Sequence, residues 1–188
     1  IVYGLRGMSY MLLDITGPAR DLHSGGYGGA IDNPINVLSH IIAQMKTLDG
    51  TVQIPGFYDN VRTLSAEERA MLEKRPFDEA TFLDDAGAPK LWGEPEFTPA
   101  ERMGARPTLD VNGIIGGYTD EGAKTVLPST VHAKISMRLV PDQKPAEINE
   151  KFINFVKSIA PPTVTVNVRA VHGADASITD WTVPAMKA

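Results

Sequence analysis

The 188-residue sequence contains no cysteine, and this absence removes two classes of site at once. Without thiols the chain has neither a disulfide scaffold nor a thiolate metal centre. It also lacks a run of 18 apolar residues, so no membrane-spanning helix is predicted. No signal peptide is recognisable, and the absence of cysteine suits a reducing compartment, so we expect a cytoplasmic protein. Because the chain starts without Met and ends in Met186-Lys-Ala, we expect both termini to be cut points.

No basic stripe runs through the sequence, and one segment carries its net charge of −5. Residues 59–101 hold 11 acidic and 5 basic residues, whereas the rest of the chain holds 12 acidic and 13 basic residues. A protein that follows a nucleic-acid backbone needs clustered Lys and Arg, so nucleic acid is not an expected partner. We expect an exposed insertion at about 51–106 that lies over the core and contains one short charged helix, 65–74.

Regular patterns of apolar residues flank this insertion. Alternation with period 2 predicts strands, and a period of 3.6 predicts helices that begin at Pro34, with Asn33 as the N-cap, and at Pro145. Gly50 and Pro161 are the expected stops of these two helices. The predicted strands are 6–16, 107–115, 129–140 and 163–170.

The order of these elements is strand, helix, strand, strand, helix, strand. That order is typical of the ferredoxin-like split βαβ arrangement. It predicts an α+β fold, a two-layer sandwich in which both helices cover one face of a four-stranded antiparallel sheet. Edge strands would remain unpaired, and a second copy of the chain is one way to cover them.

The most unusual segment is Asp21-Leu-His-Ser-Gly-Gly-Tyr-Gly-Gly. Glycine allows the backbone to approach a ligand closely, so His23 in this loop is a candidate for contact with a substrate. The spacing alone fits a surface histidine in a flexible turn at least as well. The glycines do not match a dinucleotide-binding fingerprint, because the spacing G-x-G-x-x-G is absent.

Two further residues are candidates for binding. Arg138 is expected on the open face of its strand, where a guanidinium could clamp a carboxylate or simply be solvated. Thr125 precedes the same strand in a loop and has no distinctive pattern of its own. The other histidines and the acidic pairs form no complete metal site. We expect His40 and the acidic pairs to be solvated, His132 to lie on the polar face of its strand, and His172 to lie in the exit tail. These residues are His40, His132, His172, Glu67, Glu68, Asp84 and Asp85.

Several motifs in order resemble the co-catalytic dizinc exopeptidases, a family of carnosinase-like dipeptidases, aminoacylases and succinyl-diaminopimelate desuccinylases. The Leu22-His-Ser-Gly loop resembles their His-Ser-Gly loop, and Ile54-Pro-Gly-Phe-Tyr-Asp resembles the carnosinase-like branch. Lys124-Thr-Val-Leu-Pro and Ile135-Ser-Met-Arg-Leu-Val-Pro are similar to later landmarks. The likeness covers roughly residues 3–172. It implies the dimerisation, or lid, domain of such an enzyme, with the catalytic domain missing.

The resemblance also implies roles for three residues. His23 matches a lid histidine that stabilises the oxyanion in the partner subunit's site, and Thr125 matches a threonine that binds substrate across the dimer. Arg138 matches the arginine that holds the substrate's C-terminal carboxylate. Two zinc ions are implied in the missing catalytic domain, and none in this chain.

The resemblance leads to one interpretation of the whole chain. Residues 1–172 would be the dimerisation domain, and residues 173–188 an exit segment toward the catalytic domain. The parent would be a zinc metallopeptidase that hydrolyses dipeptides or N-acyl amino acids as a homodimer, paired through a sheet edge and a helix. The isolated chain would be inactive. The alternative is a stand-alone ferredoxin-like module that binds a small molecule.

Overall fold

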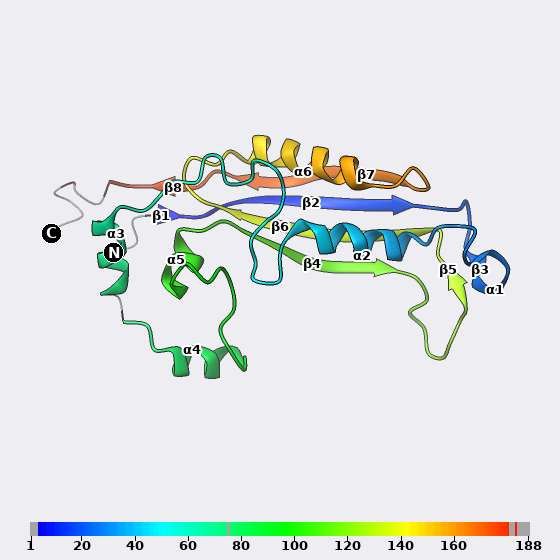
Figure 1. The fold of residues 1–188 in the computed structure, drawn as a ribbon, viewed down its shortest axis with the longest axis horizontal. Coiled ribbons are helices and arrows are strands. Elements are labelled where there is room, and N and C mark those ends of the chain that lie inside the picture. The colour runs from blue at the N-terminus through cyan, green and yellow to red at the C-terminus, as the bar shows by residue number, and fades with distance from the viewer. Residues whose placement is uncertain (1–3, 75, 181–182, 184–188) are drawn as a thin grey trace.

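The structure is a computed structural model that describes residues 4–74, 76–180 and 183. Its central sheet has four antiparallel strands in the order β4-β6-β2-β7 (Figure 1). The strands are β2 (Gly7–Thr16), β4 (Thr108–Gly116), β6 (Thr130–Leu139) and β7 (Thr165–Ala174). The predicted antiparallel sheet is therefore present.

Alternating burial along the two central strands separates a core face from an open face. In β2 and β6 nearly every second residue is fully buried, and the pairs Met11–Ile135 and Leu13–Ala133 lie on the core face. Successive side chains of a strand point to opposite faces, so the residues between them are on the open face. The predicted inward and outward positions of both strands are confirmed.

Two long helices, α2 (Pro34–Met45) and α6 (Pro145–Ile159), cover the core face. The Asn33 side chain accepts a hydrogen bond from the Ile35 backbone N–H at 2.9 Å, which confirms the predicted N-cap. Helix α2 is shorter than predicted, because the chain turns back after Met45 and Lys46 forms a β-bridge with Val52.

Both helices and the sheet share a single core, so they pack on the same face. The helices bury a stripe of apolar side chains against the odd-numbered residues of β2 and β6. The buried helical residues are Val37, Leu38, Ile41, Met45, Ile148, Phe152 and Val156. Truncating such a residue to alanine typically costs about 2–5 kcal/mol of stability.

Short strand pairs lie at the two ends of the central sheet (Figure 1). β1 (Gly4–Leu5) pairs with β8 (Ser177–Ile178) at one end. β3 (Leu22–His23) pairs with β5 (Val126–Leu127) at the other. The short helix α1 (Ser24–Tyr27) directly follows β3, so the glycine-rich segment is more ordered than a plain loop.

The last central strand extends further than its sequence pattern predicts. β7 continues to Ala174, past a bulge opposite Tyr10 and Met11 of β2. His172 consequently pairs with Tyr10 inside this strand, and its expected place in the exit tail is wrong. The alternation of Val164, Val166 and Val168 ends before the strand does, because the outer half of β7 is exposed on both faces.

The acidic insertion contains three helices, and the expectation of one is wrong. These helices are α3 (Ala66–Glu73), α4 (Glu79–Ala86) and α5 (Pro99–Gly104). Asp78 caps α4 through the Ala80 and Thr81 backbone N–H groups. Thr98 and Glu101 form a reciprocal capping box at the start of α5. Both caps are readable in the sequence, but the helices are too short to show an apolar period.

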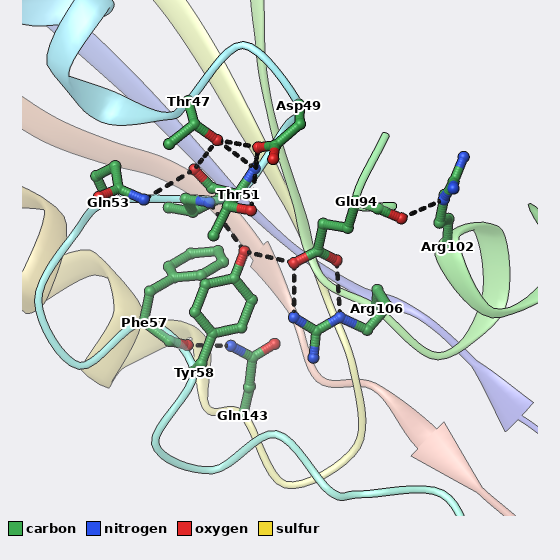
Figure 2. Close-up of polar contacts among 11 residues, drawn as sticks. Thr47, Asp49, Thr51, Gln53, Phe57, Tyr58, Glu94, Arg102, Arg106 and Gln143 are labelled. Carbon is green, nitrogen blue, oxygen red and sulfur yellow. Dashed lines mark hydrogen bonds and ion pairs between the residues drawn. The ribbon is translucent and has the colours of Figure 1, made fainter. Parts of the chain in front are cut away.

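The insertion is also less exposed than predicted, because polar contacts hold it together and one of them, from Gln143, ties it to the rest of the domain (Figure 2). Arg106 donates two hydrogen bonds to the Glu94 carboxylate, at 2.8 and 2.7 Å, and these bonds raise the pKa of Arg106. The Tyr58 hydroxyl donates to the same carboxylate, and burial raises the pKa of Tyr58. Gln143 donates from its side-chain amide to the Phe57 carbonyl at 2.7 Å.

Glu68 was expected to be solvated, but it is only 5% exposed. Its carboxylate accepts from the Ser65 backbone N–H at 2.9 Å and pairs with Arg62 at 2.8 Å. Burial raises the pKa of Glu68, yet these two partners outweigh burial and hold the pKa below its usual value. Its neighbour Glu67 is exposed, as predicted for both residues.

Glu68→Gln should therefore lower the free energy of unfolding by about 1 kcal/mol at pH 7, because it weakens a helix cap and an ion pair. Glu67→Gln is the matched control and should change it little. Because the pKa of Glu68 is lower in the folded state, its carboxylate stabilises the fold fully above the unfolded-state pKa of about 4.3. This contribution is lost as the pH falls through the folded-state pKa. The difference in the free energy of unfolding between wild type and Glu68→Gln should hence become smaller below about pH 4, as measured by denaturant titration. A difference that does not depend on pH would contradict this assignment.

Candidate functional site

His23 and Thr125, two of the predicted site residues, lie together at one end of the sheet. The antiparallel pairing of β3 with β5 places His23 opposite Val126. The Ser24 N–H donates to the Thr125 carbonyl at 2.9 Å, and this hydrogen bond joins the two segments. The His23 Nε2 and the Thr125 hydroxyl are 3.2 Å apart, and both side chains are exposed. The buried side chain of Leu127 anchors the pair to the domain.

The hydrogen bonds of His23 determine which ring nitrogen carries the proton. The Gly25 backbone N–H donates to Nδ1 at 2.9 Å. An amide N–H can only donate, so Nδ1 must be unprotonated in the neutral ring. Nε2 then carries the proton and donates it to the Thr125 hydroxyl. The exposed imidazole therefore carries an Nε2–H donor, and a hydrogen bond at each ring nitrogen fixes its orientation.

Asp21 holds this loop against the start of β6. Its carboxylate accepts from the Ser129 backbone N–H at 2.7 Å and from the Ser129 hydroxyl at 2.9 Å. These hydrogen bonds, with a smaller contribution from the charge of Lys124, lower the pKa of Asp21. The sequence pattern did not single out Asp21 or Ser129, because their contact joins segments 108 residues apart.

Arg138 lies near the opposite end of β6, where it pairs with Thr108 of β4 and Met8 of β2. It is exposed on the open face of the sheet, as predicted. From Thr130 to Arg138 the strand rises roughly 26 Å, at about 3.3 Å per residue. Strand β3, which ends in His23, lies beyond the end of the sheet at which β6 begins (Figure 1). The structure therefore brings His23 and Thr125 together and holds Arg138 far from both.

Arg138 lines a cavity of about 360 Å³ beside the start of β4. Trp92 and Met103 supply its apolar wall, and Asp110 and Arg6 lie on its polar side. The Lys46 ammonium sits over the Trp92 ring at 4.8 Å from the ring centre. Sequence analysis did not connect Arg6 with Arg138, since 131 residues separate them. The register of β2 against β6 makes them neighbours.

The remaining histidines are distributed over the domain. His40 is exposed on α2, as predicted. His132 is on the open face, where its Nδ1 lies 2.7 Å from Asp14 Oδ1. Arg169 of β7 approaches the same carboxylate at 3.6 Å. These three residues form a polar cluster on the open face near the Thr16–Thr130 end of the pairing, and the predicted place of His132 on the polar face of its strand is confirmed.

No group of three or more His, Cys, Asp or Glu side chains that could hold a metal ion exists within the described parts of the chain. The residues described here thus supply no ligand set for the zinc ions that the resemblance implies. None of the helices in the described ranges is both long and apolar enough to cross a membrane.

The fold is a mixed α/β domain with an antiparallel sheet, and its predicted site residues lie at two separate ends of that sheet. A model of the M20 peptidase dimerisation domain matches residues 3–164, and the chain belongs to this family. The family match and the predicted resemblance agree, and they favour a dimerisation domain over a stand-alone binding module.

Relatives of the chain include dipeptidases. It is 34% identical to the Cys-Gly metallodipeptidase dug1 of Schizosaccharomyces pombe, over 77% of this chain and 30% of the relative. It is 27% identical to the Beta-Ala-His dipeptidase of Homo sapiens, over 85% and 31% of the two chains. The chain thus spans about a third of the length of these curated relatives.

Solved structures show the same fold. An M20 family metallo-carboxypeptidase, Sso-CP2 from Sulfolobus solfataricus, matches with a TM-score of 0.88 and 30% identity, over 99% of this chain and 42% of that one. Human carnosine dipeptidase 1 matches with a TM-score of 0.85 and 25% identity, over 96% and 39%.

The tautomer of His23 is directly testable by ¹⁵N NMR of the imidazole nitrogens in the neutral state. Because the Gly25 N–H occupies Nδ1, the tautomer with a proton on Nδ1 should be much rarer for His23 than for His40. His40 is the control, since its ring is exposed and is not held by Gly25. A predominant Nδ1–H form of His23 would rule out the Gly25 hydrogen bond.

Proposed function

We propose that this chain is the dimerisation and substrate-capping domain of a zinc-dependent metallopeptidase that hydrolyses dipeptides or N-acyl amino acids. Membership of the M20 dimerisation-domain family supports the proposal, as do relatives that are metallodipeptidases. The chain covers only part of each relative, so the zinc ligands would come from another domain of the full-length enzyme. Zinc would activate water there, and this chain would contribute side chains to the substrate.

His23 would stabilise the negative charge that develops on the carbonyl oxygen during hydrolysis. This task needs a donor that is already oriented when the charge appears. The Nε2–H of His23 fits, because the Gly25 N–H fixes the tautomer and Thr125 fixes the ring position. An oxyanion near Nε2 would take over the hydrogen bond now accepted by the Thr125 hydroxyl. Thr125 would then be free to donate its own proton to the substrate.

Arg138 would hold the C-terminal carboxylate of the substrate. A guanidinium binds a carboxylate through two parallel N–H···O bonds and keeps its charge at all working pH values. Arg138 is exposed at the rim of a cavity large enough for a small ligand. No hydrogen bond or ion pair within the described chain occupies its guanidinium.

The distance between the two ends of the sheet is the observation that carries the dimer proposal. An extended dipeptide spans at most about 7 Å, whereas roughly 26 Å of strand lies between Thr130 and Arg138. One substrate therefore cannot use His23 and Arg138 of the same chain. A homodimer resolves this, with His23 of one subunit reaching the substrate that Arg138 of the other subunit holds. The unpaired edge of β4 and the neighbouring helix α2 are the proposed contact.

We also interpret the domain as a ferredoxin-like two-layer sandwich. The strand order β4-β6-β2-β7 and the shared core of α2 and α6 support this interpretation. Cytoplasmic location likewise stays a prediction, for which the absence of cysteine is the motive.

His23→Ala in the full-length enzyme should lower kcat and kcat/KM together by about 10²-fold, because an oxyanion donor acts in the transition state. Mixing this variant with one inactivated in its zinc ligands should restore part of the activity. The mixed dimer would hold one site with intact zinc ligands and the partner's intact His23. Subunit exchange is first demonstrated separately, with two differently labelled subunits. No recovery despite proven exchange would contradict a role for His23 across the dimer.

Arg138→Ala should raise KM about tenfold or more and leave kcat nearly unchanged, since a carboxylate clamp also acts on the bound ground state. Dipeptide amides, which lack the free carboxylate, should hardly respond. In the same mixing experiment, at low substrate concentration, the zinc-ligand variant should not rescue Arg138→Ala. Each substrate would need the zinc ligands and Arg138 from one and the same subunit, and no subunit of the mixed dimer has both. Rescue of Arg138→Ala would place this arginine across the dimer instead.

A further inference from the structure

The cavity beside Arg138 is lined by an excess of positive charge, in a chain whose net charge is −5. Two carboxylates, Glu94 and Asp110, face five cations there. The cations are Arg6, Lys46, Arg102, Arg106 and Arg138. A concave surface with walls of one charge sign attracts the opposite charge. Which of the five cations are available to a ligand depends on the contacts they already make.

Lys46 binds both Asp110 and the backbone of β4, so neither charged group is unpaired. The Lys46 ammonium donates to the Leu109 carbonyl at 2.7 Å and approaches the Asp110 carboxylate at 3.5 Å. The other Asp110 oxygen accepts from the Thr108 hydroxyl at 3.3 Å. Asp110 therefore already has two partners, although its charge also acts on Arg6.

The two arginines of the insertion that line the cavity, Arg102 and Arg106, already have hydrogen-bond partners as well. Arg106 forms a bidentate pair with Glu94. Arg102 donates to the Glu94 carbonyl at 2.7 Å and to the Trp92 carbonyl at 3.2 Å (Figure 2 shows the first of these bonds). Both guanidiniums stabilise the insertion through these hydrogen bonds. Neither can bind a ligand without losing them.

Arg6 and Arg138 remain, and neither has a hydrogen-bond or ion-pair partner within the described chain. Arg138 pairs with Met8 in the ladder between β2 and β6, and Arg6 precedes Met8 by two residues. Both side chains lie on the open face, and both line the cavity. Burial and then the charge of Arg138 lower the pKa of Arg6, and the charge of Asp110 offsets this lowering only in part. A half-buried guanidinium beside a second one is unfavourable until an anion joins them.

We propose that Arg6 and Arg138 bind a single ligand carboxylate between them, and that Arg6 is a second, specificity-determining residue of this site. A carboxylate has enough lone pairs to accept from two guanidiniums. This inference rests on the proposed function, because it assigns the shared carboxylate to the C-terminus of the substrate. It adds a residue that neither the family resemblance nor the sequence pattern pointed to.

The test is the KM of Arg6→Gln in the full-length enzyme, for a dipeptide and for the same dipeptide with an amidated C-terminus. A hydrogen bond to a charged group corresponds to about tenfold or more in affinity, so KM for the free acid should rise by about that factor with kcat nearly unchanged. KM for the amide should change less than twofold. Lys134→Gln is the matched control, since it removes one exposed charge from the same face of β6 outside the cavity, and it should have little effect on either substrate.

The outcomes separate this inference from the proposed function. If Arg138→Ala discriminates acid from amide and Arg6→Gln does not, Arg6 has no part in the site and only this inference fails. If neither variant discriminates, the carboxylate role of Arg138 fails as well. If both variants discriminate and the double variant loses less than the product of the two effects, the arginines share one carboxylate. Fully multiplicative effects would overturn the shared site.

Binding to the unmodified 188-residue chain provides a second measurement that needs no variant to fold. In an NMR titration with N-acetylglycine, the Nε–H signals of Arg6 and Arg138 should shift together with one dissociation constant. N-acetylglycine amide should shift neither signal. A response of Arg138 alone would overturn the inference.

Discussion

Ten consecutive residue pairs join β2 to β6, from Gly7–Leu139 to Thr16–Thr130, and the other features depend on this register. The register aligns the odd-numbered residues of both strands on one face, where α2 and α6 complete the core. A shift by one residue would turn that apolar set to solvent, so burial specifies the register strongly. The same ten pairs set the length of the sheet. They thereby fix how far apart the two polar ends of the domain lie.

The polar groups of the domain follow from the same alternation. Since the helices cover only the core face, charged side chains gather on the open face and at the two ends of the sheet. Asp14, His132 and Arg169 pair with one another near the Thr16–Thr130 end. Arg6 and Arg138, near one end, have no such partner within the described residues. Because Arg6 is half-buried, pairing its charge with an anion would gain more there than at a fully exposed cation.

Much of this domain could be predicted from the sequence, because its central elements have long and clear periods. The strands 6–16 and 129–140 and the helices beginning at Pro34 and Pro145 all follow from alternation and capping. In the insertion the helix at 65–74 was predicted and corresponds to α3, whereas α4 and α5 were missed because helices of eight and six residues show too little apolar period. For the candidate site, motifs identified His23, Thr125 and Arg138. Asp21 and Ser129 meet only because distant segments come together, and the proposed role of Arg6 likewise depends on the alignment of β2 with β6, so no local pattern records them.

The two ends of the sheet differ in how their side chains are held, and the difference matches the proposed tasks. His23 is fixed at both ring nitrogens, so its N–H direction is set before any substrate arrives. A donor of this kind costs little reorganisation when charge develops, which favours the transition state. The Arg138 guanidinium is exposed and unengaged within the described chain, so it gains its partners only on binding and acts on the ground state as well. A rigid donor and a free clamp could not exchange places without losing these properties. Because the sheet keeps them roughly 26 Å apart, the division of labour extends to the two subunits of the proposed dimer.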